Sequence, residues 1–164
     1  MSSPLGVFLP SLKPRDLVWV WGGECLVPES TLSLFQEAGF TGFEPIPVIV
    51  DGILRGPQTP IPQVWELKIT GRAGRDQNVP GRRYGIRCPF CGIQKRRNTV
   101  PGIHIDPKKW DGSDFSVTDN YPSIILITER VKDFIISHKL KDCSIFPAEA
   151  YPMPTDPVWV NPKL

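Results

Sequence analysis

The chain carries one pattern twice, at positions one hundred residues apart. The first copy, residues 25–48, reads CLVPESTLSLFQEAGFTGFEPIPV, and the second, residues 125–148, reads ILITERVKDFIISHKLKDCSIFPA. Few residues are identical, so the correspondence lies in residue class: an apolar run, an amphipathic stretch, then a short β-like run. Each copy therefore predicts a strand, a short helix and a second strand.

Both amphipathic stretches have the spacing of a short helix with one buried face. Their small or apolar side chains recur at positions i, i+3, i+4 and i+7, which makes one stripe on a helix of about three turns. The two stripes are Thr31, Leu34, Phe35 and Ala38, and Val131, Phe134, Ile135 and His138. The alternative is a pair of amphipathic helices with no relation to each other.

The residues that flank each stripe indicate where the helices begin and end. Pro28 suits a first helical turn, and the Thr128 hydroxyl is predicted to cap the second helix by accepting from an early helical N–H. Gly39 is predicted to end the first helix in the left-handed conformation. Lys139 takes that place in the second copy, with a steric cost if the backbone is the same.

Several other segments have the residue pattern of strands. They are 17–21 (LVWVW), 64–70 (VWELKIT) and 121–127 (YPSIILI), beside the runs that close the two copies, FEPIPV and CSIFPA. The sequence therefore predicts an α+β fold: mainly antiparallel sheet with two short amphipathic helices in a tandem strand-helix-strand repeat. The 19 prolines fall between these segments, which favours short elements with ordered connections.

We expect residues 1–164 to form a single domain with two similar halves, about 17–70 and 84–150, and a basic Gly/Arg-rich connection at 71–87. The formal net charge is only +2, but it is unevenly spread. Residues 71–98 hold eight arginines and lysines against one aspartate, a net +7, so the remainder sums to −5. The basic segment could meet nucleic acid, and the acidic remainder could meet a basic protein.

A nucleic-acid interface would use the basic segment. Its arginines would contact phosphates while Tyr84 and Phe90 stack on a base. The arginines chosen for this role are Arg82, Arg83, Arg96 and Arg97. The alternative, a solvated loop, is favoured by the several glycines of the segment. We therefore expect nucleic acid not to be the main partner.

The sequence predicts a cytoplasmic protein that does not enter a membrane. The N-terminal residues contain no uninterrupted apolar run of signal-peptide length, and no segment has the ~20 apolar residues of a membrane helix. Without an export signal, free thiols or metal ligands are favoured over disulfides. Cys25 and Cys143 lie in apolar surroundings and are predicted to be buried free thiols.

The sequence does not indicate an enzyme. It has no Gly-x-Ser-x-Gly, His-Glu-x-x-His, phosphate-binding loop or dinucleotide fingerprint. Of the two histidines, His138 falls on the stripe of the second helix, where a core or boundary imidazole is expected. His104 alternates with Ile103 and Ile105 on a short predicted strand. We therefore predict no catalytic residues.

One short motif, Cys88-Pro-Phe-Cys91-Gly92, has the form of half a zinc site. Neighbouring arginines would favour the thiolate form that binds metal. His104 follows at the spacing of a third ligand in finger-type sites. The fourth ligand is left open between Cys25, Cys143, His138 and water. A metal-free knuckle and a disulfide-capable turn are equally open, so zinc is a candidate cofactor and no other is indicated.

Roughly residues 17–149, and strongly only 84–149, resemble the double-CXXCG motif family, a paralogous group abundant in myxobacteria that includes immunity proteins. The resemblance lies in a Cys-x-x-Cys-Gly, an Asp/Phe loop, a Tyr-Pro that opens a strand, and a Thr-Glu-Arg that begins a helix. These are Cys88, Cys91 and Gly92; Asp114 and Phe115; Tyr121 and Pro122; and Thr128, Glu129 and Arg130. Family members typically carry a second Cys-x-x-Cys-Gly nearer the N-terminus, and none occurs before Leu17 here.

The resemblance implies a cytoplasmic immunity protein that neutralises a cognate antibacterial toxin, encoded nearby, by stoichiometric binding. Such an inhibitor needs a preorganised face with aromatic anchors and complementary charge. The candidate anchors are Trp110 and Phe115, ringed by Asp111, Asp114 and Asp119. An acidic rim would suit a basic toxin such as a nuclease. The alternatives are loop-to-core packing of these aromatics and, for the whole protein, a small zinc-knuckle module that binds nucleic acid or regulates. Edge strands in a small sheet also make a homodimer plausible.

Overall fold

The computed structural model of the protein describes residues 5–20, 23–57, 59–75, 83–87, 94–97, 102–118 and 121–151. The α-helices are α1 (Glu29–Glu37) and α2 (Glu129–Ser137). The strands are β1 (Gly6–Leu9), β2 (Val18–Trp19), β3 (Cys25–Pro28), β4 (Phe43–Pro47), β5 (Ile49–Ile53), β6 (Val64–Ile69), β7 (Gly71–Arg72), β8 (Gly74–Arg75), β9 (Arg83–Arg87), β10 (Gln94–Arg97), β11 (Ile105–Asp106), β12 (Phe115–Thr118) and β13 (Tyr121–Ile127). Short 3-10 helices η1 (Pro107–Lys109) and η2 (Ala148–Ala150) complete the described elements.

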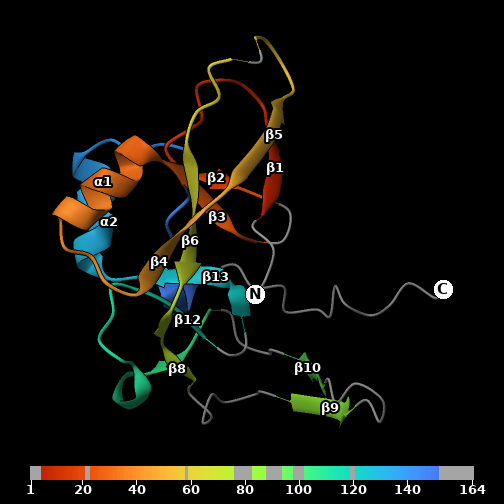
Figure 1. The fold of residues 1–164 in the computed structure, drawn as a ribbon. Helices are drawn as coiled ribbons and strands as arrows, with labels where there is room; N and C mark the ends of the chain where they lie inside the picture. The colour runs from red at the N-terminus through yellow and green to blue at the C-terminus, as the bar shows by residue number, and fades with distance from the viewer. Residues whose placement is uncertain are drawn as a thin grey trace.

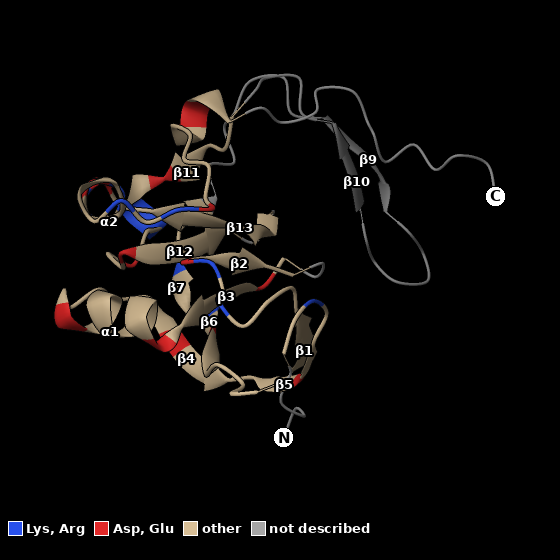
Figure 2. Cartoon of the chain, turned by 90° about the horizontal axis from the view of Figure 1, so that it is seen from above, with Lys and Arg blue, Asp and Glu red and all other residues tan. Residues whose placement is uncertain are grey.

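The fold is α+β with mainly antiparallel sheet, as the sequence predicts. A four-stranded antiparallel sheet has the order β2-β3-β6-β4, and a three-stranded sheet has the order β13-β12-β7. Only the pairings β1–β5 and β12–β7 are parallel among the described strands. The two helices lie side by side on one flank of these sheets (Figures 1 and 2).

Both predicted helices are present, one in each copy of the pattern. Each spans nine residues, and their positions differ by one hundred. Both also end in the same way: Gly39 has a φ of 65° and Lys139 a φ of 54°. The N–H of the residue after each donates back to the helix, Phe40 N to Phe35 O at 3.2 Å and Leu140 N to Ile135 O at 3.0 Å. This is the Schellman arrangement, with its hydrophobic contact between the two residues that the hydrogen bond joins.

The second copy departs from the prediction at its far end. Residues 43–47 form β4 because they pair with β6, whereas 143–147 form no strand, and no described strand lies beside them as β6 lies beside β4. The predicted strand at 17–21 is limited to Val18–Trp19 within the described residues.

Two further predictions for the second helix are wrong. Thr128 lies at the N-cap but makes no capping hydrogen bond, because its hydroxyl donates to Asp114 instead. His138 is exposed and not part of a buried stripe. It lies at the C-cap, past the last turn that faces the core, and its ring stacks on Phe134 at 3.8 Å between centroids.

The main core contains side chains from both halves. Phe35 of α1 lies at its centre, fully buried, with Phe115 of β12 at 5.4 Å and Phe134 of α2 at 6.2 Å between ring centroids. Its buried members are Leu17, Cys25, Val27, Leu32, Phe35, Phe40, Leu67, Phe115, Val131 and Ile135. The alternation of β3 sends Leu26 to the opposite face, where a second cluster lies under the β1–β5 pair.

The two sheets meet where β6 ends at Ile69 and β7 begins at Gly71. Gly71, the first residue of β7, lies so close to the loop before β12 that a Cβ on it would meet Ser113 Oγ at 2.0 Å and Phe115 O at 2.1 Å. Gly42 approaches the same carbonyl with a φ of +89°. Only glycine permits this approach of backbones, which brings residues 113–115 against the end of the first half.

Candidate protein-binding site

The predicted toxin-binding segment begins at an ordered surface turn. Asp106 Oδ1 accepts from Lys108 N at 3.1 Å and so starts η1, which delivers Trp110 to the surface. Trp110 is 40% exposed, and its indole Nε1 donates to Ser113 O at 3.1 Å. The ring is therefore held in place while much of its area remains open to a partner.

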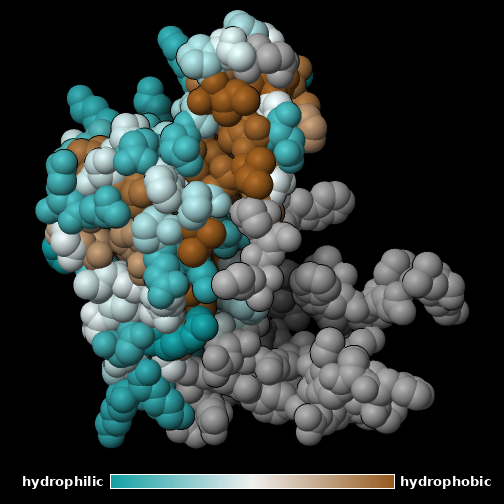
Figure 3. Space-filling model, viewed as in Figure 1, coloured by the Kyte–Doolittle hydropathy of each residue, from teal (hydrophilic) through white to brown (hydrophobic). Residues whose placement is uncertain are grey.

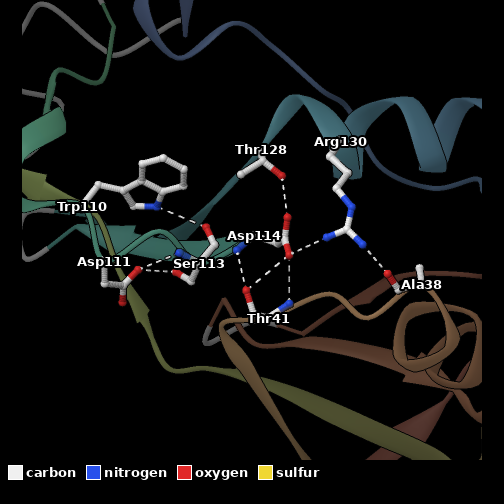
Figure 4. Close-up of polar contacts among 8 residues, drawn as sticks. All are labelled: Ala38, Thr41, Trp110, Asp111, Ser113, Asp114, Thr128 and Arg130. Atoms are coloured by element: carbon white, nitrogen blue, oxygen red, sulfur yellow. Dashed lines mark hydrogen bonds and ion pairs between the residues drawn. The ribbon is translucent and has the colours of Figure 1, made fainter.

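Asp111 is fixed beside this ring from two sides (Figure 4). Its Oδ1 accepts from Ser113 N at 3.0 Å and from the Ser113 hydroxyl. Its Oδ2 accepts from Arg72 N at 2.7 Å, which ties the turn to β7. The hydrogen bonds from Ser113, chiefly that of its side chain, lower the pKa of the exposed Asp111 carboxyl. An exposed, charged carboxylate thus stands next to an exposed indole.

Asp114, four residues after Trp110, has a different environment. It is only 8% exposed. Its Oδ2 accepts from Thr41 N at 3.1 Å and Thr41 Oγ1 at 3.3 Å, and its Oδ1 accepts from Thr128 Oγ1 at 2.9 Å (Figure 4). The backbone adds to this link, since Asp114 N donates to Thr41 Oγ1 and Thr128 N donates to Asp114 O.

Arg130 completes the cluster from the first turn of α2. Its Nη1 lies 3.1 Å from Asp114 Oδ2, and its Nη2 donates to Ala38 O at the end of α1. The guanidinium also lies over the Phe40 ring, 4.7 Å from the centroid. This cluster, Asp114 with Thr41, Thr128 and Arg130, joins the end of the first helical unit to the start of the second.

These positions revise the predicted toxin-binding set. Trp110 and Asp111 are at the surface. Phe115 is 3% exposed and packs in the main core, so it cannot act as a surface anchor. Asp114 is committed to the cluster that joins the two units, so it cannot form part of an acidic rim. Asp119 lies outside the described residues.

Sequence reasoning missed Thr41, Ser113 and the part that Arg130 plays. Thr41 follows the glycine that ends α1, and nothing in its local pattern points to a partner far along the chain. The Asp111-x-Ser113 spacing is a signal that could have been used, because an aspartate often accepts from the backbone two residues on. Arg130 was noted only as part of a motif.

The structure brings together no metal site among the described residues, where no three His, Cys, Asp or Glu side chains cluster. Cys88, Cys91 and Arg82 lie outside the described residues. Arg83 belongs to β9, and Arg96 and Arg97 belong to β10; for both strands the backbone alone is described. His104 directly precedes β11, which pairs with β8 and not with β9 or β10. Within the described residues, the donor set for zinc is therefore incomplete.

Cys25 and Cys143 are free thiols, and of the predicted burial of both only that of Cys25 is complete. Cys25 is 1% exposed and Cys143 is half-buried. Burial raises the pKa of Cys25 to about 12, with a smaller contribution from Cys143. Burial also raises the pKa of Cys143, helped by the negative charges of Asp142 and Asp16. Both side chains line one cavity beside β13.

Other exposed apolar side chains gather away from Trp110. Ile49 of β5 and Leu54, which follows it, are 51% and 67% exposed, and Phe8 of the paired strand β1 is 62% exposed. Figure 3 shows the hydrophobic patch that runs along β5. Two acidic residues, Glu29 and Glu37, are the first and last residues of α1.

Compared with family models, with curated proteins and with solved structures, the chain matches none of them. The resemblance of residues 84–149 to the double-CXXCG motif family therefore stays a prediction. Among the helices of the described residues, none has the length and apolar character needed to cross a membrane.

Proposed function

We propose that the protein is an immunity protein, which neutralises a cognate antibacterial toxin by stoichiometric binding and not by catalysis. The observation that carries the proposal is the turn at 110–113, where a partly exposed indole and a charged carboxylate are both held by hydrogen bonds. Interfaces draw most of their binding energy from a few such anchors, with Trp prominent among them. Because the turn is fixed before a partner arrives, less entropy is lost on binding.

The proposed contact is narrower than the segment 110–119. Trp110 would enter a pocket on the toxin, and Asp111 would pair with a basic residue at its edge. A basic toxin such as a nuclease would suit this carboxylate, and opposite charges would speed association. The remaining members of the segment that the structure describes, Asp114 and Phe115, would support the turn from within.

The test is co-purification of the tagged protein with the product of the neighbouring open reading frame, followed by an assay of that product's toxicity. We expect Trp110→Ala to weaken the complex by about 2 kcal/mol or more, roughly thirtyfold in Kd. Asp111→Lys should mainly slow association, and more so at low salt.

Phe8→Ala provides the matched control, since Phe8 is a more exposed aromatic on a different surface. Unchanged affinity for Trp110→Ala, with wild-type circular dichroism, would remove the turn from the interface. If the neighbouring gene product neither binds nor is silenced, the proposed immunity function itself is wrong.

A second candidate function, a zinc-knuckle module that binds nucleic acid or regulates, is favoured by one observation. β9 and β10 form an antiparallel pair, with Arg83 opposite Arg97 and Tyr84 opposite Arg96. The residues between these strands include Cys88 and Cys91, so both thiols belong to the connection of a hairpin with basic strands. Retained zinc together with salt-sensitive binding to DNA or RNA, lost in Arg96→Gln/Arg97→Gln, would favour this function.

A further inference from the structure

The second half of the repeat lacks a strand that the first half has. In the first half, β6 lies between β3 and β4 and pairs with both. β13 corresponds to β3, and residues 143–147 correspond to β4. No described strand pairs with that edge of β13, nor with 143–147.

Hydrogen-bond directions show which edge of β13 this is. Backbone groups of alternate residues in a strand point to opposite neighbours. Glu24 O accepts from Val20 N, so the backbone groups of even-numbered residues in and next to β3 point to β2, and those of odd-numbered residues point to β6. In the second half Thr128 N donates to Asp114 O, so even-numbered residues face β12. β12 therefore pairs with the edge of β13 that corresponds to the β2 side of β3. The other edge of β13, which is open, corresponds to the edge of β3 that pairs with β6.

A cavity lies at that open edge. Residues 124–127 of β13 and residues 143–146 both line it, together with first-half residues that include Leu17, Trp19 and Cys25. Because successive side chains of a strand alternate between its faces, a cavity that all four of these residues border reaches the edge of β13. The corresponding residues of the first half, 24–27 and 43–46, flank β6. The cavity thus occupies the place of the strand that the second half lacks.

The cavity is apolar and has the size of one large side chain. Its volume is about 150 Å³, and Leu67, Phe115 and Ile135 contribute to its lining. A cavity of about that volume in another protein holds a benzene ring. In the first half, β6 contributes three side chains to the main core: Leu67, which is buried, and Trp65 and Ile69, which are partly buried against it.

The chain itself carries a segment like β6 that leads on from this cavity. Tyr151 lines the cavity and is the last described residue. Beyond it the sequence continues PMPTDPVWVNPKL, in which Val158-Trp159 repeats a residue pair found in two strands of the first half, Val64-Trp65 of β6 and Val18-Trp19 of β2. The seven residues from Tyr151 to Val158 can span up to roughly 25 Å. That length is ample to reach a site whose wall includes Tyr151.

We propose that the edge of β13 facing residues 143–146 is a strand-binding site, and that its occupant is the chain's own segment 157–161. The segment enters antiparallel to β13, as β6 does to β3, and Trp159 fills the cavity. The second half then has the same strand arrangement as the first, with a strand between β13 and residues 143–147. The inference does not depend on the proposed immunity function.

The test compares the full chain with a variant that lacks residues 152–164. Two readouts report on the site: amide hydrogen exchange at 124–127 and alkylation of Cys143 by N-ethylmaleimide. We expect the truncation to speed both by about tenfold or more, because the strand partner and the cover of the cavity are lost. A synthetic peptide of residues 156–163, added to the truncated protein, should restore the slower rates.

Single substitutions keep the test valid if the truncated chain folds poorly. Trp159→Ala should speed Cys143 alkylation, whereas Lys163→Ala, near the end of the segment, should leave it unchanged. The proposal is overturned if truncation alters neither readout. It is also overturned if a peptide of β6 (residues 63–70) protects the site in the full chain, since the edge would then be open to a partner's strand. The proposal is overturned as well if the full chain is a dimer and the truncated chain a monomer, because the segment would then bind to a second copy of the protein.

Discussion

At the scale of single residues, Asp114 has the clearest structural role. One carboxylate accepts from Thr41 of the first half and from Thr128 and Arg130 of the second. Removal of a buried acceptor leaves its donors without partners, which costs more than the hydrogen bonds contribute net. Asp114 therefore links the two helical units through hydrogen bonds and is not a surface residue that contacts a partner.

We expect Asp114→Ala to lower the free energy of unfolding by about 2–4 kcal/mol, because the Arg130 charge and the Thr41 N–H lose their acceptor. Urea denaturation followed by circular dichroism measures the loss. The control is Glu44→Ala, which removes an exposed ion pair with Lys68 and should change stability by less than about 1 kcal/mol. A loss of similar size in both variants would contradict the assigned role.

The buried thiol of Cys25 gives a second prediction at this scale. In a Cys88→Ser/Cys91→Ser background, Cys25 should react with a disulfide reagent at pH 8 far more slowly than in guanidinium. Its pKa of about 12 against a usual 9.0 implies roughly a thousandfold less thiolate. The raised pKa also stabilises the fold fully below pH 9.0, and this contribution falls as the pH rises towards 12. Fast, stoichiometric labelling of Cys25 in the native protein would contradict its burial.

At the scale of elements, the matched ends of α1 and α2 allow a paired test. Lys139 adopts the left-handed conformation that Gly39 adopts in the first helix, and an L-residue there costs about 1–2 kcal/mol. We expect Lys139→Gly to stabilise the protein by about 0.5–1 kcal/mol, after the extra backbone entropy of glycine is subtracted. Gly39→Ala should destabilise it by a similar amount. Thermal unfolding of both variants measures the change in Tm. Equal changes in Tm of the same sign would contradict the shared helix-end geometry.

The sequence predicted these helices well because their signals are local. An apolar stripe and a glycine at the end are properties of nearby residues, and both helices appear at the predicted positions. The strand at 143–147 failed because a strand needs a neighbour, which no local pattern reveals. Asp114 and Phe115 were assigned to the surface because their loop is polar, yet contacts with distant residues such as Thr41 bury them. Trp110 and Asp111 were placed at the surface correctly, since their contacts lie mostly within the turn.

At the scale of the whole molecule, the two halves meet along the backbone as well as through side chains. Gly71 brings the start of β7 against Ser113 and Phe115 without room for a methyl group. The close approach lets β7 pair with β12 in parallel, so a strand that continues β6 becomes part of the other sheet.

We expect Gly71→Ala to destabilise the protein by about 2–4 kcal/mol, because the added carbon would overlap the Phe115 carbonyl and force the sheets apart. Gly112→Ala is the control: it has a φ of +84° but open space around its Cα, so only the conformational cost of about 1–2 kcal/mol applies. The free energies of unfolding of the two variants are compared from the midpoints and slopes of their denaturant transitions. A loss for Gly71→Ala no larger than the control's would show that the halves can separate there without cost.

The pairing of β7 with β12 also sets an order of events during synthesis. β7 leaves the ribosome with the first half, but its partner is made only after the whole basic segment has followed. Until then the first half has an unpaired strand at its end and lacks Phe115 in the core that surrounds Phe35. An unpaired strand and an incomplete core favour aggregation, so we expect the first half to be least protected until the second half has been made.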